Sequence, residues 1–324
     1  MSGPSRAALI EEIRAFIPPL AQHLHKGASG KLGVFGGSAE YTGAPYFVAI
    51  SALRTGADLA HVVCTQAAAT AIKSYCPDVI VHPLLPSRSS SSSSSAGGDL
   101  TEEERRGVDA AMEQIGEWLP RFTGLVLGSG LGRDKAVQLC AKKIIEQAKD
   151  RKMPLVIDGD GISSVVCVWP SLVEGYKEVV LTPNFPEYQR LCKAAGCEED
   201  TPVMDLARKM GNVTIVQKGQ TDKISDGRIV VECTEAGSPR RCGGQGDITS
   251  GSIGTFLSWA HAYKEKDSLK YPPNVLAGYA GCLMTREANK AAFAKKGRST
   301  IVSDMIEEIG QVFAESLEKH ASSL

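Results

Sequence analysis

Residues 124–161 read GLVLGSGLGRDKAVQLCAKKIIEQAKDRKMPLVIDGDG, and this stretch decides the fold. Two short apolar runs, 124–127 and 155–157, each lead into a polar, glycine-rich loop. Between them, residues 135–147 carry apolar side chains at helical spacing. Continuous apolar strands that alternate with helices are typical of a parallel sheet covered on both faces.

The same alternation continues on both sides of this stretch. Further strands are expected at 32–35, 59–64, 79–82, 179–181 and 213–217, and a hairpin at 223–232 turns at 226–227. Helices are expected at 8–17, 46–55, 101–118, 162–168, 187–195, 248–263, 275–291 and 301–317. The sequence therefore predicts an α/β fold with a mainly parallel central sheet and an antiparallel edge.

The overall composition is that of an ordinary globular protein. The 324 residues are 43% hydrophobic and 23% charged. Lys plus Arg number 36 and Asp plus Glu 37, and this balance argues against nucleic acid or an anionic membrane as partner. No apolar run reaches the roughly 18 residues that a membrane-spanning helix needs. No linker is evident, so residues 1–324 are expected to form one domain.

Cysteine usage bears on the cellular compartment. The nine cysteines are odd in number and scattered, which favours free thiols in a reducing compartment over a disulfide framework. Glu11 and Glu12 argue against a mitochondrial presequence, and we expect a cytoplasmic protein. The serine run 89–95 belongs to a low-complexity loop near 87–98 that is expected to be disordered.

The sharpest chemical signal is the stretch 242–251, CGGQGDITSG, which leads into a long apolar helix. Amides at a helix N-terminus bind anions, and glycines let those amides approach a phosphoryl group closely. Asp247 has two interpretations, a helix N-cap or a general base for a hydroxyl beside that phosphate. The stretch is not a P-loop, because it lacks the G-x-x-x-x-G-K-[ST] pattern.

Two more loops follow predicted strands. Lys218 and Gly219 directly follow the predicted strand at 213–217, and a lysine at the end of a strand can neutralise phosphate. The alternative interpretation is an ordinary polar turn. Asn184 and Glu187 are three residues apart, which suits Mg²⁺ held through water; capping of the following helix is the alternative.

Other polar loops complete the set. A G-x-G-x-G pattern occupies 128–132, the paired carboxylates Asp158 and Asp160 suggest a metal or proton site, and further glycines lie at 25–38. Because the carboxyl ends of parallel strands share one edge of a sheet, we expect a single crevice suited to phosphoryl transfer. The six histidines show no ligand spacing and are interpreted as structural or surface residues.

In this order the motifs resemble the ribokinase-like superfamily and, within it, the ATP-dependent NAD(P)H-hydrate dehydratase family. The resemblance runs from about residue 24 to 256 and is carried by HKG at 25–27, GGSxxYxGA at 36–44, ALRxGA at 52–57, GxGLGR at 128–133, DGD at 158–160, TPNxxE at 182–187, KGxxD at 218–222 and GGxGD at 243–247. It implies a ribokinase-like three-layer α/β/α sandwich. Family members often have Ala at the position of Gly159 and His at that of Phe185.

The resemblance implies repair of hydrated nicotinamide nucleotides: ATP phosphorylates the ring hydroxyl of the S epimer of NADHX or NADPHX, and phosphate then leaves. Asp247 would be the general base, with Mg²⁺ held through water by Asn184 and Glu187. ATP, the co-substrate, would be held by Lys218, Gly219, Gln220, Thr221, Asp222, Gly237, Gly243, Gly244, Gln245 and Gly246. The hydrate would be held by Gly130, Asn184, Phe185, Pro186, Glu187, Tyr188, Gln189, Arg190 and Asp247.

Two other functions stay open at this point. A ribokinase-like kinase that acts on a vitamin or alcohol hydroxyl would share Asp247 and the glycine-rich phosphate-binding stretch before it. Such a kinase would lack the motifs at 25–44 and would release a stable phosphoester. A non-catalytic nucleotide-binding protein would keep the glycine-rich phosphate-binding stretch and lose Asp247. The resemblance also implies a separate NAD(P)H-hydrate epimerase as functional partner, and the sequence leaves homo-oligomer formation open.

Overall fold

The computed structural model describes residues 4–21, 25–86 and 100–318. The predicted disordered loop near 87–98, with its serine run, lies outside the described residues. Within the described ranges one sheet contains β1 (Lys31–Phe35), β2 (Leu59–Thr65), β3 (Val79–Leu85), β4 (Gly124–Leu127), β5 (Leu155–Ile157), β6 (Val179–Leu181), β7 (Thr214–Gln217), β8 (Asp222–Ser225) and β9 (Val230–Cys233).

The strand order in this sheet is β3-β2-β1-β4-β5-β6-β7-β8-β9. All neighbouring pairs from β3 to β7 are parallel, whereas β8 is antiparallel to both β7 and β9. The predicted parallel sheet with an antiparallel edge is therefore confirmed. The helices are α1 (Arg6–Phe16), α2 (Gly43–Thr55), α3 (Gln66–Tyr75), α4 (Glu102–Trp118), α5 (Lys135–Asp150), α6 (Phe185–Ala194), α7 (Val203–Lys209), α8 (Gln245–Ala262), α9 (Pro273–Lys296) and α10 (Val302–Ser316).

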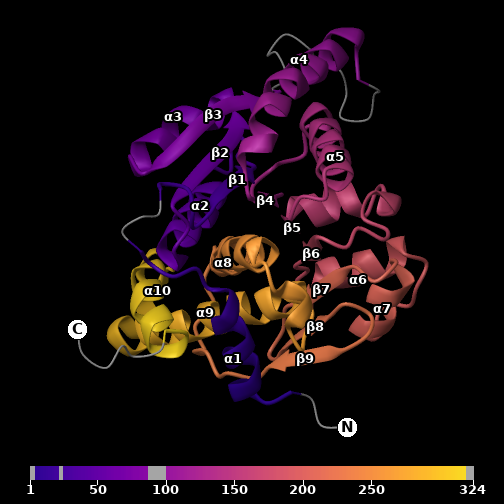
Figure 1. Cartoon of the computed structure of the whole chain (residues 1–324). Coiled ribbons are helices and arrows are strands. Elements are labelled where there is room, and N and C mark those ends of the chain that lie inside the picture. The colour runs from indigo at the N-terminus through magenta and orange to yellow at the C-terminus, as the bar shows by residue number, and fades with distance from the viewer. Residues whose placement is uncertain (1–3, 22–24, 87–99, 319–324) are drawn as a thin grey trace.

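Helices cover both faces of the sheet, so the predicted three-layer sandwich is confirmed (Figure 1). Helices α1, α2, α3, α8, α9 and α10 pack on one face, and α4 to α7 pack on the other. Successive strand residues point to opposite faces: Val126 and Val156 belong to the first core, and Leu127 and Ile157 to the second. This double burial explains why the strands read as unbroken apolar runs.

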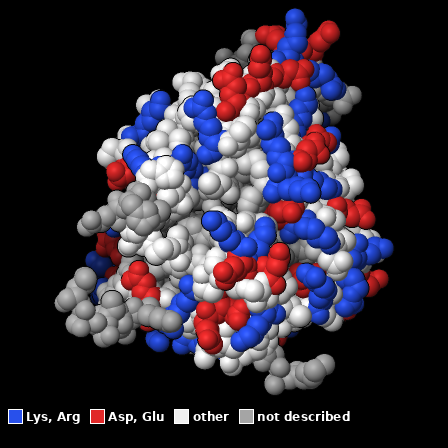
Figure 2. All heavy atoms as spheres, in the orientation of Figure 1, with Lys and Arg blue, Asp and Glu red and all other residues white. Residues whose placement is uncertain are grey.

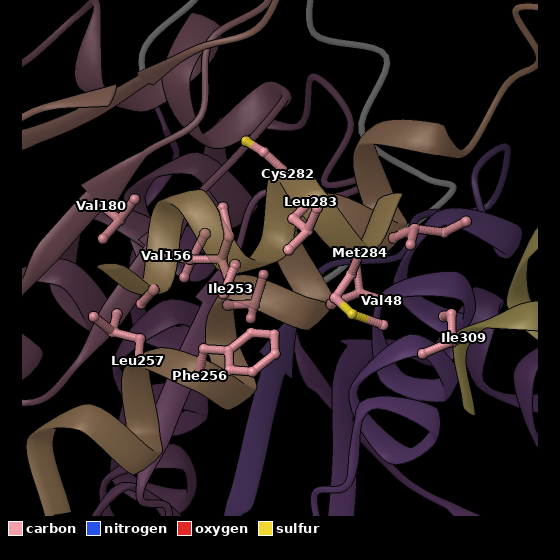
Figure 3. Packing of buried hydrophobic residues seen from close by; sticks show 14 of the residues in the cluster. Val48, Val156, Val180, Ile253, Phe256, Leu257, Cys282, Leu283, Met284 and Ile309 are labelled. Carbon is pink, nitrogen blue, oxygen red and sulfur yellow. The ribbon is translucent and has the colours of Figure 1, made fainter. Parts of the chain in front are cut away.

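Helix α8 lies at the centre of the first core. Figure 3 shows Ile253 and Phe256 of α8 beside Leu283 and Met284 of α9, over Val156 of β5. All five side chains are fully buried. The packing fixes the position of α8, and the N-terminus of this helix carries the stretch 242–251.

Two helices and one local geometry differ from the sequence-based expectation. Helices α3, of 10 residues, and α7, of 7 residues, were not predicted. The helix expected at 162–168 is instead a π-helical segment, Gly161–Val166. Its wide turn is closed by the bond from the amide of Cys167 to the carbonyl of Ile162, which spans five residues.

The surface carries both signs of charge. On the face shown in Figure 2, Lys and Arg side chains are interspersed with Asp and Glu, in keeping with the formal net charge of -1. Among the described residues, no helix is both long and apolar enough to cross a membrane.

Candidate active site

The loops that follow β1, β4, β5, β6 and β7 meet at the carboxyl edge of the sheet, as predicted. The amide of Gly37 donates to the carbonyl of Gly130 at 3.0 Å, and the amide of Gly132 donates to the Asp160 carboxylate at 2.9 Å. The amide of Lys218 donates to the carbonyl of Pro183 at 2.9 Å. These bonds join the loops into one continuous platform.

A buried ion pair lies at the middle of this platform. The Lys218 Nζ is 2.8 Å from Asp158 Oδ1, and only 6% of the Asp158 side chain is exposed. Burial acts to lower the pKa of Lys218, but the negative charges of Asp158, Glu187 and Asp247 outweigh it and raise this pKa above its ordinary value. Lys218 is therefore a fixed positive charge surrounded by carboxylates.

Asp247 lies beside this pair, in the first turn of α8. The helix begins after Gly244, whose φ of +90° suits glycine, and no side chain caps it. The interpretation of Asp247 as an N-cap is therefore wrong. The amides of Gln245 and Gly246 stand in the first turn, where helix amides have no intrahelical partner, so they are free to bind an anion.

The carboxylate of Asp247 has a strongly altered acidity. Burial raises its pKa to about 7, and the charge of Asp158 adds to the rise. Ser129 and Lys218 lower the pKa and oppose this shift. The Ser129 hydroxyl is buried and lies close enough to the Asp247 carboxylate to lower its pKa. A carboxylate with a pKa near neutrality is suited to accept a proton.

Asn184 and Glu187 form a capping box at the start of α6. The amide of Glu187 donates to Asn184 Oδ1 at 3.0 Å, and the amide of Asn184 donates to Glu187 Oε2 at 2.9 Å. Burial raises the pKa of Glu187, whereas the charge of Lys218 lowers it. The capping alternative is therefore confirmed, and one carboxylate oxygen of Glu187 stays outside the box.

A cavity of about 580 Å³ opens next to Lys218, which is the size of a small-molecule site. Its lining includes many of the residues predicted to hold ATP or the hydrate: Asn184, Lys218, Gly219, Gln220, Thr221, Asp222, Gly237, Gln245 and Gly246. It also includes Ser238, Arg241 and Thr249, which lie within or beside the glycine-rich stretch already predicted to bind ATP. The sequence did not single out the remaining lining residues: Thr234, Glu235, Ala236, Thr285, Arg286 and Asn289.

Arg286 of α9 is the main support of this cavity. Its Nε donates to Asp222 Oδ2 at 2.7 Å, and its two Nη atoms donate to the carbonyls of Gly219 at 2.9 Å and Glu235 at 3.0 Å. Asp222 also accepts a bond from the amide of Gly219 at 2.9 Å. The Asp222 carboxylate therefore stabilises the conformation of the loop 218–222 and links this loop to α9.

The other predicted site residues do not line the cavity. Gly243 and Gly244 precede α8, and Asp247 follows the lining residue Gly246 in the first turn of that helix. Gly130 lies in the loop after β4, and Phe185 to Arg190 form the first part of α6, where Phe185 is 63% exposed.

Two side chains of α6 have partners elsewhere. The hydroxyl of Tyr188 donates to the carbonyl of Thr201 at 2.6 Å, and the amide of Gln189 donates to Glu199 at 3.0 Å. In this structure, the side chains of Tyr188 and Gln189 are engaged away from the Lys218 pair.

The HKG segment at 25–27 lies at the opposite, amino edge of the sheet, ahead of β1. There the carboxylate of Asp58 accepts bonds from the amides of Gly27 at 2.7 Å and Ser29 at 2.9 Å. This part of the motif therefore stabilises a turn at the end of β1 that is opposite to the carboxyl edge, where the other loops meet. His61 and His82 hydrogen-bond to each other at 2.9 Å within the sheet, in keeping with the structural interpretation.

The described residues contain no group of three or more His, Cys, Asp or Glu side chains placed to ligate a metal directly. The metal or proton site suggested for Asp158 and Asp160 stays a prediction: in this structure Asp158 pairs with Lys218, and Asp160 accepts a hydrogen bond from the amide of Gly132.

The fold and site together define a ribokinase-like α/β protein. A structure from Enterococcus faecalis, described as a ribokinase-like superfamily protein, matches with a TM-score of 0.71 at 20% identity, over 98% of this chain and 97% of that one. The ADP/ATP-dependent NAD(P)H-hydrate dehydratase of Bacillus subtilis, co-crystallised with ATP and Mg²⁺, matches with a TM-score of 0.65 at 16% identity, over 94% and 96%.

Sequence comparison defines the family within this fold. Residues 32–311 match the family described as NAD(P)H-hydrate dehydratase. The ATP-dependent (S)-NAD(P)H-hydrate dehydratase of Pongo abelii is 44% identical over 315 residues, which are 95% of this chain and 89% of the relative. The chain belongs to the NAD(P)H-hydrate dehydratase family of enzymes.

Proposed function

We propose that this chain uses ATP to dehydrate the S epimer of NADHX and NADPHX, restoring NADH and NADPH with release of ADP and phosphate. The observation that carries the proposal is the position of Asp247. Its carboxylate, with a pKa of about 7, lies beside the Lys218–Asp158 pair, one residue after Gly246 in the lining of a cavity of about 580 Å³. The family to which the chain belongs supports the same reaction.

In the proposed reaction Asp247 accepts the proton of the ring hydroxyl as that oxygen attacks the terminal phosphorus of ATP. The P–O bond to ADP breaks, and Lys218 with the amides of Gln245 and Gly246 stabilises the charge on the phosphoryl oxygens. The phosphorylated ring then expels phosphate with the electron pair of the C–O bond, assisted by the lone pair of the ring nitrogen. The neighbouring ring proton passes to the departing phosphate or to water, and its C–H electron pair forms the double bond of the dihydropyridine.

Phosphorylation is needed because hydroxide is a poor leaving group and phosphate a good one. This explains why a lyase reaction would use a site of kinase type. A simple kinase would stop at the phosphoester, and the family to which the chain belongs favours the dehydratase over that alternative. The loop 218–222 and Gly237 would hold ATP, and the loop after β4 with the start of α6 would hold the hydrate.

Mg²⁺ fits this site as a water-held ion. The Lys218 ammonium is surrounded by the carboxylates of Asp158, Glu187 and Asp247, and Glu187 retains an oxygen outside its capping box. Oxygen donors of this kind suit Mg²⁺, which keeps most of its water shell. We propose that Asn184 and Glu187 hold the ion through water, where it would neutralise charge on the ATP phosphates.

The remaining parts of the proposal concern the setting of the enzyme. We propose one functional domain over residues 1–324, since a single sheet joins the described parts of the chain. All nine cysteines are free, which supports a reducing compartment such as the cytoplasm. Because the reaction takes only the S epimer, a separate epimerase would supply it from the R epimer.

The direct test is an assay with ATP, Mg²⁺ and freshly prepared NADHX. Appearance of NADH absorbance that depends on both ATP and the chain is the expected result. A chain that converts ATP and a vitamin alcohol into a stable phosphoester, and leaves NADHX unchanged, would show the kinase alternative to be right.

The pH dependence of the reaction should report Asp247. A base must be deprotonated to act, so kcat/KM should fall as pH drops through about 7, well above the ordinary range of an aspartate. Burial is the main cause of the raised pKa of Asp247; the charge of Asp158 adds to the rise, and Ser129 and Lys218 oppose it. Asp158→Asn should therefore move the acidic limb to lower pH. A limb that stays in place in this variant would argue against the electrostatic coupling.

A further inference from the structure

The order of the loops along the sheet shows on which side of Asp247 the hydrated ring must lie. The cavity is bounded by segments after β7 and β9, which lie towards one end of the strand order. Asp247 interacts with Ser129 and Asp158, which follow β4 and β5. Phosphoryl transfer places the attacking oxygen opposite the leaving group. If ATP fills the cavity, the ring therefore lies beyond Asp247, over β4 and its neighbour β1.

Tyr41 occupies this position after β1. Its amide donates to the carbonyl of Ser38 at 3.2 Å, and the amide of Ser38 donates back to the carbonyl of Tyr41 at 3.3 Å, which closes a tight turn. The turn rests on Gly130, where a Cβ atom would come within 2.9 Å of the Cβ and carbonyl oxygen of Tyr41. The backbone is thus fixed, yet Tyr41 is 57% exposed.

One polar side chain on the same loops lacks a partner among the described residues. The hydroxyl of Ser38 is buried and forms no hydrogen bond with them, and this residue is only 9% exposed. Buried hydroxyls in proteins almost always have a partner, so an unpaired one calls for an explanation. A ligand with hydrogen-bonding groups, bound beside Tyr41, would supply that partner.

We propose, on the basis of the dehydratase function above, that Tyr41 and Ser38 are specificity-determining residues for the hydrated nicotinamide ring. The phenol ring of Tyr41 packs against the conjugated face of the substrate ring, and the Ser38 hydroxyl binds its carboxamide. Both residues belong to the segment 36–44, and the proposed reaction steps give no other role to this segment. A small alcohol has neither a ring face nor a carboxamide, so this subsite favours the nucleotide hydrate.

The test compares Tyr41→Ala, Tyr41→Phe and Ser38→Ala with wild type in the NADHX assay, with KM measured separately for NADHX and ATP. We expect Tyr41→Ala to raise the KM for NADHX about fivefold, because an aromatic contact is worth about 1 kcal/mol beyond its buried area, while the KM for ATP stays unchanged. Tyr41→Phe keeps the ring and should stay near wild type, and Ser38→Ala should raise the same KM.

Leu20→Ala serves as the control, because Leu20 is 91% exposed and lies outside the site. Since Tyr41 is exposed, its replacement should leave Tm unchanged. An active Tyr41→Ala variant with a wild-type KM for NADHX, or with both KM values raised equally, overturns the ring subsite alone. A wild-type chain that makes no NADH from NADHX and ATP overturns the proposed function and this assignment with it.

Discussion

Asp247→Asn should lower kcat by about 10²–10⁴-fold, or roughly 3–5 kcal/mol in activation free energy, because the variant loses the group that accepts the hydroxyl proton. Asparagine has nearly the same shape, and the cavity that we propose for ATP is lined by Gly246 and Gln245 rather than by Asp247 itself. ATP binding should therefore be almost unchanged. The measurements are kcat with NADHX and the Kd for ATP by calorimetry.

Asp205→Asn is a matched control for this variant. Asp205 also stands in the first turn of a helix, α7, but pairs with Arg208 on the surface at 2.9 Å. Its replacement should leave kcat unaffected. Wild-type turnover in Asp247→Asn would exclude Asp247 as the base. Loss of ATP binding would show that the substitution disturbs the glycine-rich phosphate-binding stretch instead.

The second large effect is expected for Lys218→Ala, which removes the positive charge at the phosphoryl site. Losing one such preorganised donor typically costs about 10²–10³-fold in kcat, and the KM for ATP should rise as well. The change also leaves Asp158, only 6% exposed, without its partner, so Tm should fall.

A double variant separates these two effects. Lys218→Ala with Asp158→Asn no longer buries an unpaired charge, so Tm should recover while turnover stays low. Lys142→Ala removes a lysine from a more exposed pair with Glu146 and should change neither property measurably. If Lys218→Ala alone kept a normal kcat and a normal KM for ATP, Lys218 would have no part in the site.

The central sheet could be predicted from sequence because both of its faces are buried. Val126 and Leu127 point to different cores, yet both are apolar, and so the strand reads as one continuous run. Predicted and observed bounds agree at 124–127, 155–157 and 179–181. The turn after β5 was harder, because nothing in the sequence marks the five-residue hydrogen bonds of a π-helical segment.

The meeting of the polar loops at the carboxyl edge of the sheet could be predicted, because each of these loops directly follows a strand. One part of the cavity wall could not be predicted, because it comes from α9, more than 60 positions after Lys218 in the chain. Arg286 and Asn289 do leave a signal: they are polar residues on a largely buried helix, and each bonds to a cavity loop. Periodicity identifies such a helix, but it does not show which loops the helix meets.

The product balance of a complete reaction tests the dehydratase account most directly. With limiting NADHX and excess ATP, phosphorus NMR combined with NADH absorbance should show ADP, inorganic phosphate and NADH formed in equal amounts, with no other phosphoester accumulating. A phosphorylated hydrate that persists, or ATP that is consumed without NADH, would contradict the account and favour a simple kinase.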